Sequence, residues 1–329
     1  MDKNKHNYNG WLTGISRGVL AAILLLPLSL LLSGCFTGIE STPKITYKDV
    51  KKQQAGETPE QVFSRNFRSV TFNDWQPGRR FLAGEGRLEL SYSPQPGKPA
   101  ILSRGDTLCY RGIREVKGIT GRMDAEMIFT VGKSLTDTVI YRPGTDVATL
   151  RERENIKLPF LVDLDLIEDA SHYLLDKELY TRTDRWTVET PVDTAPRKFL
   201  RVKITGVTAG NEDYPYLIRF ISLEPGGETG STLMSVNVDD GSPALRGFEN
   251  LFIMNNPRDS YPHISNEKWQ LIREGKVAVG MTGQEVMLSL GMPRDIDRRH
   301  NQSMSYERWI YTGGVYLVFE DGVVTSFNQ

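Results

Sequence analysis

The middle of the chain alternates apolar and polar residues in the way that half-buried strands do. Between about Val70 and Val238, short runs of this kind are separated by breaks that contain glycine and proline, which interrupt strands. A short helix is predicted before them, because Thr58 is suited to cap it, Pro59 to fill its first position and Val62 to face a core. The clearest predicted strands are 87–92, 127–131 and 199–204.

This strand-rich region looks duplicated. Apolar positions recur at an offset that falls from 92 to 90 residues, a drift that short insertions in loops explain. The repeat predicts two small β barrels or sandwiches in tandem. The alternative is a chance match between two segments of similar strand composition. The matched positions are Phe81-Leu82 with Tyr173-Leu174, Ile113 and Val116 with Ile204 and Val207, and Ile128 with Ile218.

The last 65 residues predict two helices followed by a three-stranded antiparallel sheet. Ser265 is placed to cap the first helix and Gly275 to end it. Thr282 and Glu285 form a capping box for the second helix, in which each side chain bonds to the backbone amide of the other residue. Asp321-Gly322 predicts a two-residue hairpin. The predicted strands are 304–311, 315–319 and 323–327.

Short motifs follow one another in a fixed order along this C-terminal segment. They are Gly280-Met281-Thr282, Glu285-Val286, Leu290-Gly291-Met292-Pro293, Trp309-Ile310-Tyr311 and 316–323. In this order and spacing they resemble the SmpA/OmlA (BamE-like) module, which is similar in turn to the β-lactamase-inhibitor-protein fold. The resemblance implies a module that binds other proteins through its sheet and loops. The long segment before it does not fit the small assembly factor of that family, and is more similar to larger envelope lipoproteins that carry such a module.

Three aromatic residues of the module form its candidate interaction surface. The alternative is that they pack the two helices on the sheet, as most aromatic side chains in such a small domain do. The three residues are Trp309, Tyr311 and Tyr316.

The first 34 residues have the pattern of a signal peptide. Basic residues precede an apolar run, Val19 to Leu32, which is shorter than the roughly 20 residues that a membrane-spanning helix needs. The run ends in Leu32-Ser33-Gly34-Cys35, which resembles a bacterial lipobox. The resemblance implies cleavage between Gly34 and Cys35. The alternative is an uncleaved membrane anchor with a chance cysteine.

Lipidation is what this resemblance implies for Cys35. The thiol would carry diacylglycerol and the freed amine an acyl chain such as palmitate, and two or more chains anchor a protein stably where one does not. Phe36 stands where an aspartate would favour the inner membrane of enteric bacteria, so the outer membrane is expected, on its periplasmic face or at the cell surface. No further cofactor is predicted.

These patterns together predict an α+β chain in five parts. A mostly β middle region, read as two tandem units, is followed by a C-terminal ααβββ module. The parts are the signal peptide 1–34, a flexible tether 35–57, a first β unit with its N-terminal helix 58–155, a second β unit 156–258, and the module 259–329.

The charge of the chain and its few reactive residues argue against several classes of function. The 40 basic and 41 acidic residues give a net charge of −1, which provides no electrostatic case for nucleic acid. Once Cys35 is lipidated, Cys109 is the only thiol, and it is predicted to be buried. The four histidines lie far apart, so no metal site is predicted. No nucleophile elbow, phosphate loop or dinucleotide fingerprint occurs, so the chain is not predicted to be an enzyme.

The leading hypothesis is therefore a membrane-anchored, non-catalytic lipoprotein that binds or helps to assemble other envelope proteins. The alternative is an envelope hydrolase or glycan-binding protein with its site in the β-rich middle region. Its carboxylates would be Asp163 and Asp165, two residues on one face of a predicted strand. The non-functional interpretation of the acidic stretch 163–169 is that it forms an edge exposed to solvent.

Overall fold

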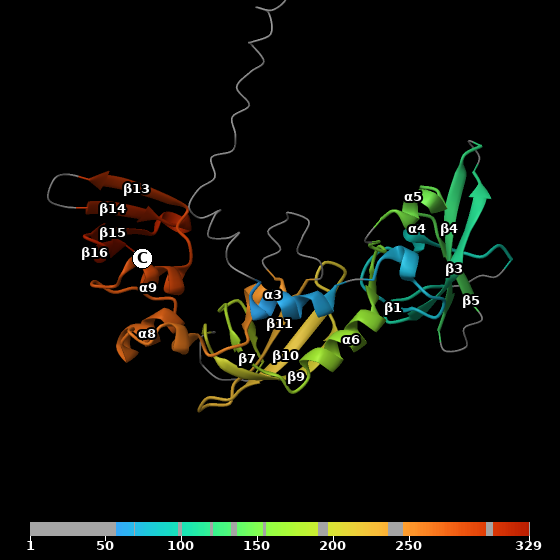
Figure 1. The fold of residues 1–329 in the computed structure, drawn as a ribbon. Helices are drawn as coiled ribbons and strands as arrows, with labels where there is room; N and C mark the ends of the chain where they lie inside the picture. The colour runs from blue at the N-terminus through green and yellow to red at the C-terminus, as the bar shows by residue number, and fades with distance from the viewer. Residues whose placement is uncertain are drawn as a thin grey trace, which may run out of the picture. The chain divides into compact units, whose positions relative to one another are not determined.

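The structure, a computed structural model, contains three antiparallel sheets with short helices between them (Figure 1). The predicted α+β class, with more strand than helix, is confirmed. The signal segment with Gly34, Cys35 and the tether up to residue 56 lie outside the described residues. The structure describes residues 57–68, 70–97, 101–118, 121–132, 137–153, 156–189, 197–235, 246–300 and 305–328.

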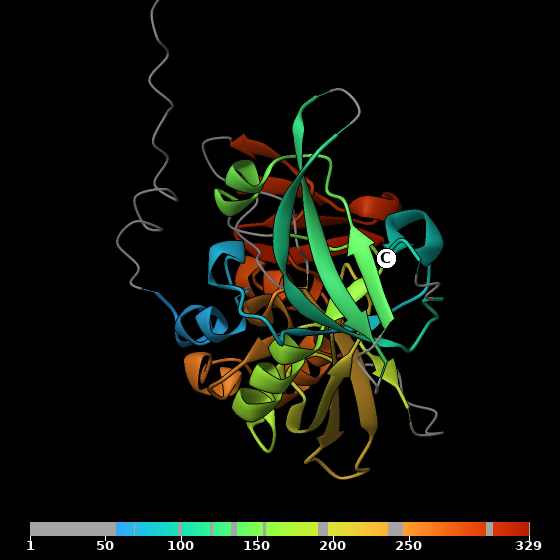
Figure 2. The same ribbon diagram turned by 90° about the vertical axis from the view of Figure 1, so that its right-hand side faces the viewer.

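The first sheet has the strand order β2-β5-β4-β3-β1-β6. Its core is rich in aromatic rings, and the Phe81 and Phe129 rings meet edge to face with centroids 5.9 Å apart. Strands β3 and β4 form a long twisted hairpin (Figure 2). The strands are β1 (Arg80–Ala83), β2 (Tyr92–Pro94), β3 (Thr107–Lys117), β4 (Met123–Val131), β5 (Asp137–Tyr141) and β6 (Leu161–Asp163).

The predicted strand 87–92 is wrong over most of its length. Residues Leu88–Ser91 form a helical turn, α4, and only Tyr92 continues into β2. A strand would place Leu88 and Leu90 on the same face. The turn instead buries Leu88, at 3% exposure, and leaves Leu90 at 72%.

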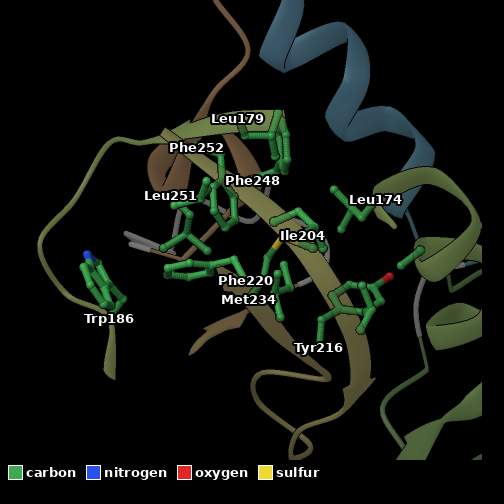
Figure 3. Packing of buried hydrophobic residues seen from close by; sticks show 14 of the residues in the cluster. Leu174, Leu179, Trp186, Ile204, Tyr216, Phe220, Met234, Phe248, Leu251 and Phe252 are labelled. Atoms are coloured by element: carbon green, nitrogen blue, oxygen red, sulfur yellow. The ribbon is translucent and has the colours of Figure 1, made fainter. Parts of the chain in front are cut away.

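The second sheet has the order β12-β7-β9-β10-β11-β8. Figure 3 shows its core, in which Phe220, Phe248 and Phe252 lie together. Helix α6 (Leu164–Leu174) contributes Leu166, Ala170 and Leu174 to the same core. The remaining elements are β7 (Glu178–Thr181), β8 (Thr187–Val188), β9 (Arg201–Ala209), β10 (Tyr216–Ser222), β11 (Thr229–Met234), α7 (Phe248–Leu251) and β12 (Phe252–Ile253).

The first two sheets repeat one another in topology. Each contains a four-stranded meander, β1-β3-β4-β5 in the first and β7-β9-β10-β11 in the second. The registers align Phe81 with Leu179, and each second strand has a bulge followed by a glycine, Gly112 or Gly206. The structure thus contains two curled sheets with the same strand order.

The residue matches that predicted a duplication from the sequence are wrong. Tyr173 and Leu174 end helix α6, so they do not correspond to strand residues 81–82. Ile113 corresponds to Val207, because each is the residue after the glycine that follows the bulge. Short apolar runs do not distinguish the end of a helix from a strand, and apolar matches alone do not fix the register within a strand.

The segment after each meander adds to its open edge. Strand β6 pairs antiparallel with β1, and β12 pairs antiparallel with β7. The hydrogen bonds correspond as well: the Gly84 N–H donates to the Phe160 carbonyl at 2.8 Å, and the Arg182 N–H to the Leu251 carbonyl at 2.8 Å. Strand β6 therefore completes the first sheet, although it lies beyond the predicted boundary at residue 155.

The N-terminal helix α3 (Pro59–Ser64) packs on the second core, which corrects its predicted place in the first unit. The Phe63 and Phe248 rings have centroids 4.9 Å apart. Glu60 accepts a hydrogen bond from the Met254 N–H at 2.9 Å. Such a pairing spans 194 residues, so local sequence patterns carry no sign of it.

The third sheet follows two helices, as predicted, but has four strands rather than three. The additional strand is β13, whose sequence Asp-Ile-Asp-Arg-Arg-His has one apolar residue and hence no clear alternation. The Ser265 cap and the Thr282–Glu285 capping box are confirmed. The elements are α8 (Asn266–Arg273), α9 (Gly283–Leu290), β13 (Asp295–His300), β14 (Ser305–Ile310), β15 (Tyr316–Glu320) and β16 (Val323–Asn328).

Candidate functional site

The two faces of the C-terminal sheet differ, because side chains alternate along each strand. One face packs on α8 and α9 and forms the third core, which includes Ile272, Val286 and Leu317. We call the opposite face the outer face. It consists of Asp295, Asp297, Arg299, Tyr306, Arg308, Ile310, Tyr316, Val318, Glu320, Val323, Ser326 and Asn328.

Trp309, the first of the three predicted surface residues, belongs to the third core. Its side chain is 6% exposed and its ring lies 4.5 Å from the Phe319 centroid. Gly283, the first residue of α9, leaves room for the ring, since a Cβ there would be 3.1 Å from it. The indole N–H donates to Glu307 at 2.8 Å. Trp309 therefore holds helix on sheet, and its assignment to an interaction surface is wrong.

The other two predicted residues lie on opposite faces. Tyr311 is partly buried against the third core and donates its hydroxyl to the Gly291 carbonyl at 3.1 Å. Burial raises the pKa of Tyr311 to about 12. Tyr316 lies on the outer face, where the Arg308 guanidinium sits 4.5 Å from its ring centroid. Of the predicted set, only Tyr316 belongs to the outer face.

Three further apolar residues accompany Tyr316. Tyr306, Ile310 and Val318 are half-buried and belong to none of the three cores. The register places Ile310 beside Tyr316 and Arg308 beside Val318, so the apolar and cationic groups interleave across β14 and β15. The strand alternation of 305–310 and 316–320 would have identified them from the sequence, had Trp309 been assigned to the core face.

A buried carboxylate lies on the first sheet, away from its core. Glu126 is 4% exposed and accepts hydrogen bonds from Arg114 at 2.9 Å and Arg142 at 2.7 Å. Burial by itself would raise the pKa of Glu126, but the bonds from the two arginines outweigh it and hold the pKa below its usual value. The three side chains link β3, β4 and the residue that follows β5, because Arg114 lies opposite Glu126 and Arg142 comes directly after Tyr141. This cluster has the character of a cross-strand brace.

The carboxylates of the hydrolase alternative have structural partners. Asp163 caps α6 by accepting from the Leu166 N–H at 3.2 Å, and lies 2.6 Å from the Arg79 guanidinium. Burial raises the pKa of Asp163 above its ordinary value. Asp165, in the first turn of α6, accepts from Arg80 at 2.8 Å. The predicted strand through both residues is wrong, because Asp163 ends β6 and Asp165 lies in the helix that follows. Glu168 and Asp169 are exposed, as a solvated stretch requires.

A shallow depression, too small to hold a water molecule, lies at the second core. Its walls are apolar, from Trp186, Phe220 and Leu251. The buried Thr232 hydroxyl at this depression has no hydrogen-bond partner among the described residues. In Figure 3, Trp186 lies to one side of the packed rings of this core.

The remaining sequence predictions concern cysteine, metal and membrane. Cys109 is buried, as predicted, and donates to the Gly78 carbonyl at 3.3 Å. Within the described ranges, no three His, Cys, Asp or Glu side chains are grouped as a metal site requires. None of the helices described is long and apolar enough to cross a bilayer.

Comparison with known protein families, with curated proteins and with solved structures gives no match for this chain.

Proposed function

We propose that this chain is a lipid-anchored lipoprotein of the bacterial outer membrane that binds other envelope proteins and catalyses no reaction. The sequence Leu32-Ser33-Gly34-Cys35, directly after a short apolar run, supports the anchor. The observation that carries the binding role is the outer face, where half-buried apolar side chains lie opposite the face that the helices cover.

The chemistry of the outer face suits a protein partner. Protein interfaces are enriched in tyrosine and arginine, and their apolar centres are ringed by polar groups. Here Tyr306, Ile310 and Tyr316 supply the apolar part, and Arg308 is held over the Tyr316 ring. A guanidinium positioned in this way loses less side-chain freedom on binding than a free one does.

The hydrolase or glycan-binding alternative has less support. Acid–base chemistry needs carboxylates that face a substrate from two sides. Asp163 and Asp165 are instead occupied by a helix cap and by Arg79 and Arg80.

The anchor is tested by the mass of the mature N-terminus and by cell fractionation. We expect the native chain to begin with an acylated Cys35 and to pellet with membranes. Cys35→Ala should stay in the precursor form without acyl chains. A mature chain that is soluble and begins with an unmodified thiol would overturn the proposal.

The binding role is tested by a photocrosslinking amino acid placed at Tyr316 in intact cells. Thr205, exposed on the second sheet, is the matched control site. We expect Tyr316 adducts with a defined envelope protein that are absent from the control and that Arg308→Ala weakens. Equal adducts at both sites would contradict an interface on the outer face.

A further inference from the structure

The sheets differ in how much unpaired edge they leave. The edge strands of the first two sheets are β2, β6, β8 and β12, and each has two or three residues. Short edge strands are a common way to prevent pairing with other chains. The edge strands of the third sheet, β13 and β16, have six residues each.

The two long edges are not equivalent. Along β16, the Gly280 N–H donates to the Val324 carbonyl at 2.8 Å, and the Val324 N–H donates to the Met281 carbonyl at 2.8 Å. A β-bridge joins Thr282 to Val323 beside them. In the part of the chain that the structure describes, β13 has a partner on one side only, which is β14. In the first two sheets, by contrast, the first strand of each meander has a second partner: β6 pairs with β1, and β12 pairs with β7.

The ladder shows which backbone groups of β13 point away from the sheet. Ser305 of β14 and Tyr311, the residue after this strand, bond toward the β15 side, through the Asp321 N–H and the Val315 carbonyl. Because bonding direction alternates along an antiparallel strand, Tyr306, Arg308 and Ile310 bond toward β13. Their register partners are Asp295, Asp297 and Arg299. The N–H and C=O groups of Ile296 and Arg298 therefore point away from the sheet. The Ile296 N–H donates locally to the Asp295 carboxylate at 2.9 Å, a bond that pairing with another strand would replace.

The charges along this edge are divided. Acidic Asp295 and Asp297 lie in the first half of β13, and basic Arg298 and Arg299 in the second half. An antiparallel strand of the same sequence would bring the basic half of one copy beside the acidic half of the other. The edge is thus complementary to itself, which is the requirement for a twofold symmetric interface.

We propose that β13 is the interface between two copies of this chain. The two β13 strands pair antiparallel about a twofold axis at Arg298, so that the C-terminal sheets become one continuous sheet. Asp297 of each copy then lies opposite Arg299 of the second copy, and opposite charges across a ladder stabilise pairing. Their side chains are accessible for this, at 45% and 76% exposure.

The choice of register follows from the backbone groups that point away from the sheet. The proposed register places Arg298 against Arg298 and Ile296 against His300, so that all three outward-pointing residues of β13 are paired. A register displaced by two residues would pair only Ile296 with Arg298 within β13, and would exchange the Asp297–Arg299 pairs between copies for Asp295–Arg299 pairs. The two Arg298 side chains that meet at the axis each lie 3.2 Å from Glu307 of their own sheet, which offsets their charge.

This inference goes beyond the proposed function and is independent of any other partner. Pairing at β13 uses backbone groups in the plane of the sheet, so it leaves the outer face uncovered. The outer faces of two copies would join into one larger surface.

The first test is a disulfide at the axis, in the full-length chain in isolated membranes. Directly opposed residues of an antiparallel pair have Cα atoms about 5.5 Å apart, which a disulfide can bridge. We expect Arg298→Cys to give a disulfide-linked dimer on mild oxidation. Thr205→Cys, exposed on the second sheet and outside the outer face, is the control for random collision. Equal dimer yields from the two variants would overturn the proposal.

The second test exchanges charges in the Arg298→Cys background. Asp297→Arg alone places arginine against arginine between copies, and Arg299→Asp alone places aspartate against aspartate, so each should lower the dimer yield about tenfold. Co-expression of the two variants should restore a mixed dimer, because all pairs across the axis are then of opposite charge. If the mixture forms no more dimer than the separate variants, the proposed register is wrong.

Discussion

Leu161 and Val162 are adjacent in β6, yet their side chains pack into different hydrophobic cores, Leu161 into the first and Val162 into the second. Phe252 and Ile253 of β12 divide in the same way between the second core and the third. Successive side chains of a strand point to opposite faces, so a strand of two or three residues is enough to contribute to two cores. Each connecting strand therefore ties the core before it to the core after it.

Truncating the two neighbours should affect different parts of the chain. We expect Val162→Ala to lower the free energy of unfolding by about 1–2 kcal/mol and Leu161→Ala by about 2–4 kcal/mol. In hydrogen exchange, Val162→Ala should release amides of β9 and β10 more than those of β3 and β4, and Leu161→Ala should do the reverse. Identical exchange patterns for both variants would show that the cores do not respond separately.

Replacing Glu126 by glutamine should destabilise the chain in a pH-dependent way. The bonds from Arg114 and Arg142 are charge-assisted, so their loss should cost about 2 kcal/mol at pH 7. Because the pKa of folded Glu126 lies below its ordinary value of 4.5, the carboxylate stabilises the fold above that pH. Denaturant titrations should show the gap between wild type and Glu126→Gln closing as the pH falls below about 4.5. A stability difference between the two proteins that does not change with pH would contradict a stabilising role for the Glu126 carboxylate.

Gly230 should tolerate no side chain. A Cβ at this position would lie 2.6 Å from the Trp186 ring and 2.9 Å from the Phe220 ring. We expect Gly230→Ala to cost about 1–3 kcal/mol, because two large rings must move. Gly206, also in a strand of this sheet, has nothing within 4 Å of an added Cβ and is the control. Thermal melts that rank Gly206→Ala as the more harmful change would refute this account of the packing.

Substitutions of Trp309 and Tyr316 should have different effects, the first on the stability of the fold and the second on partner binding. Trp309→Ala removes a buried ring from the third core and should cost about 3–5 kcal/mol of unfolding free energy. Tyr316→Ala changes the outer face, so we expect a loss of less than about 1 kcal/mol with weaker partner capture. Denaturation distinguishes the two when it is measured on the same preparations as the crosslinking yield of a photocrosslinking amino acid placed at Val318 of the outer face. Full crosslinking by a stable Tyr316→Ala chain would remove this residue from the interface.

Tertiary contacts determine several features of the fold that local sequence patterns do not predict. The place of α3 on the second core depends on Phe63 meeting Phe248, far away in the chain. The correspondence between the first two sheets depends on their strand pairing, which aligns Phe81 with Leu179 and Ile113 with Val207. Trp309 and Tyr316 are both aromatic strand residues, and only the side of the sheet that the helices cover assigns one to the core and the other to the outer face.

The sequence by itself determined the features whose physics is local. Thr282 and Glu285 lie within one helical turn of each other, so their capping box forms from nearest neighbours alone. Asp321 and Gly322 both adopt a positive φ, of 48° and 84°, as the tight hairpin requires. Strand β13 shows the opposite case. Its charged residues carry little β propensity of their own, and only pairing with β14 makes them a strand and leaves one edge of that strand unpaired.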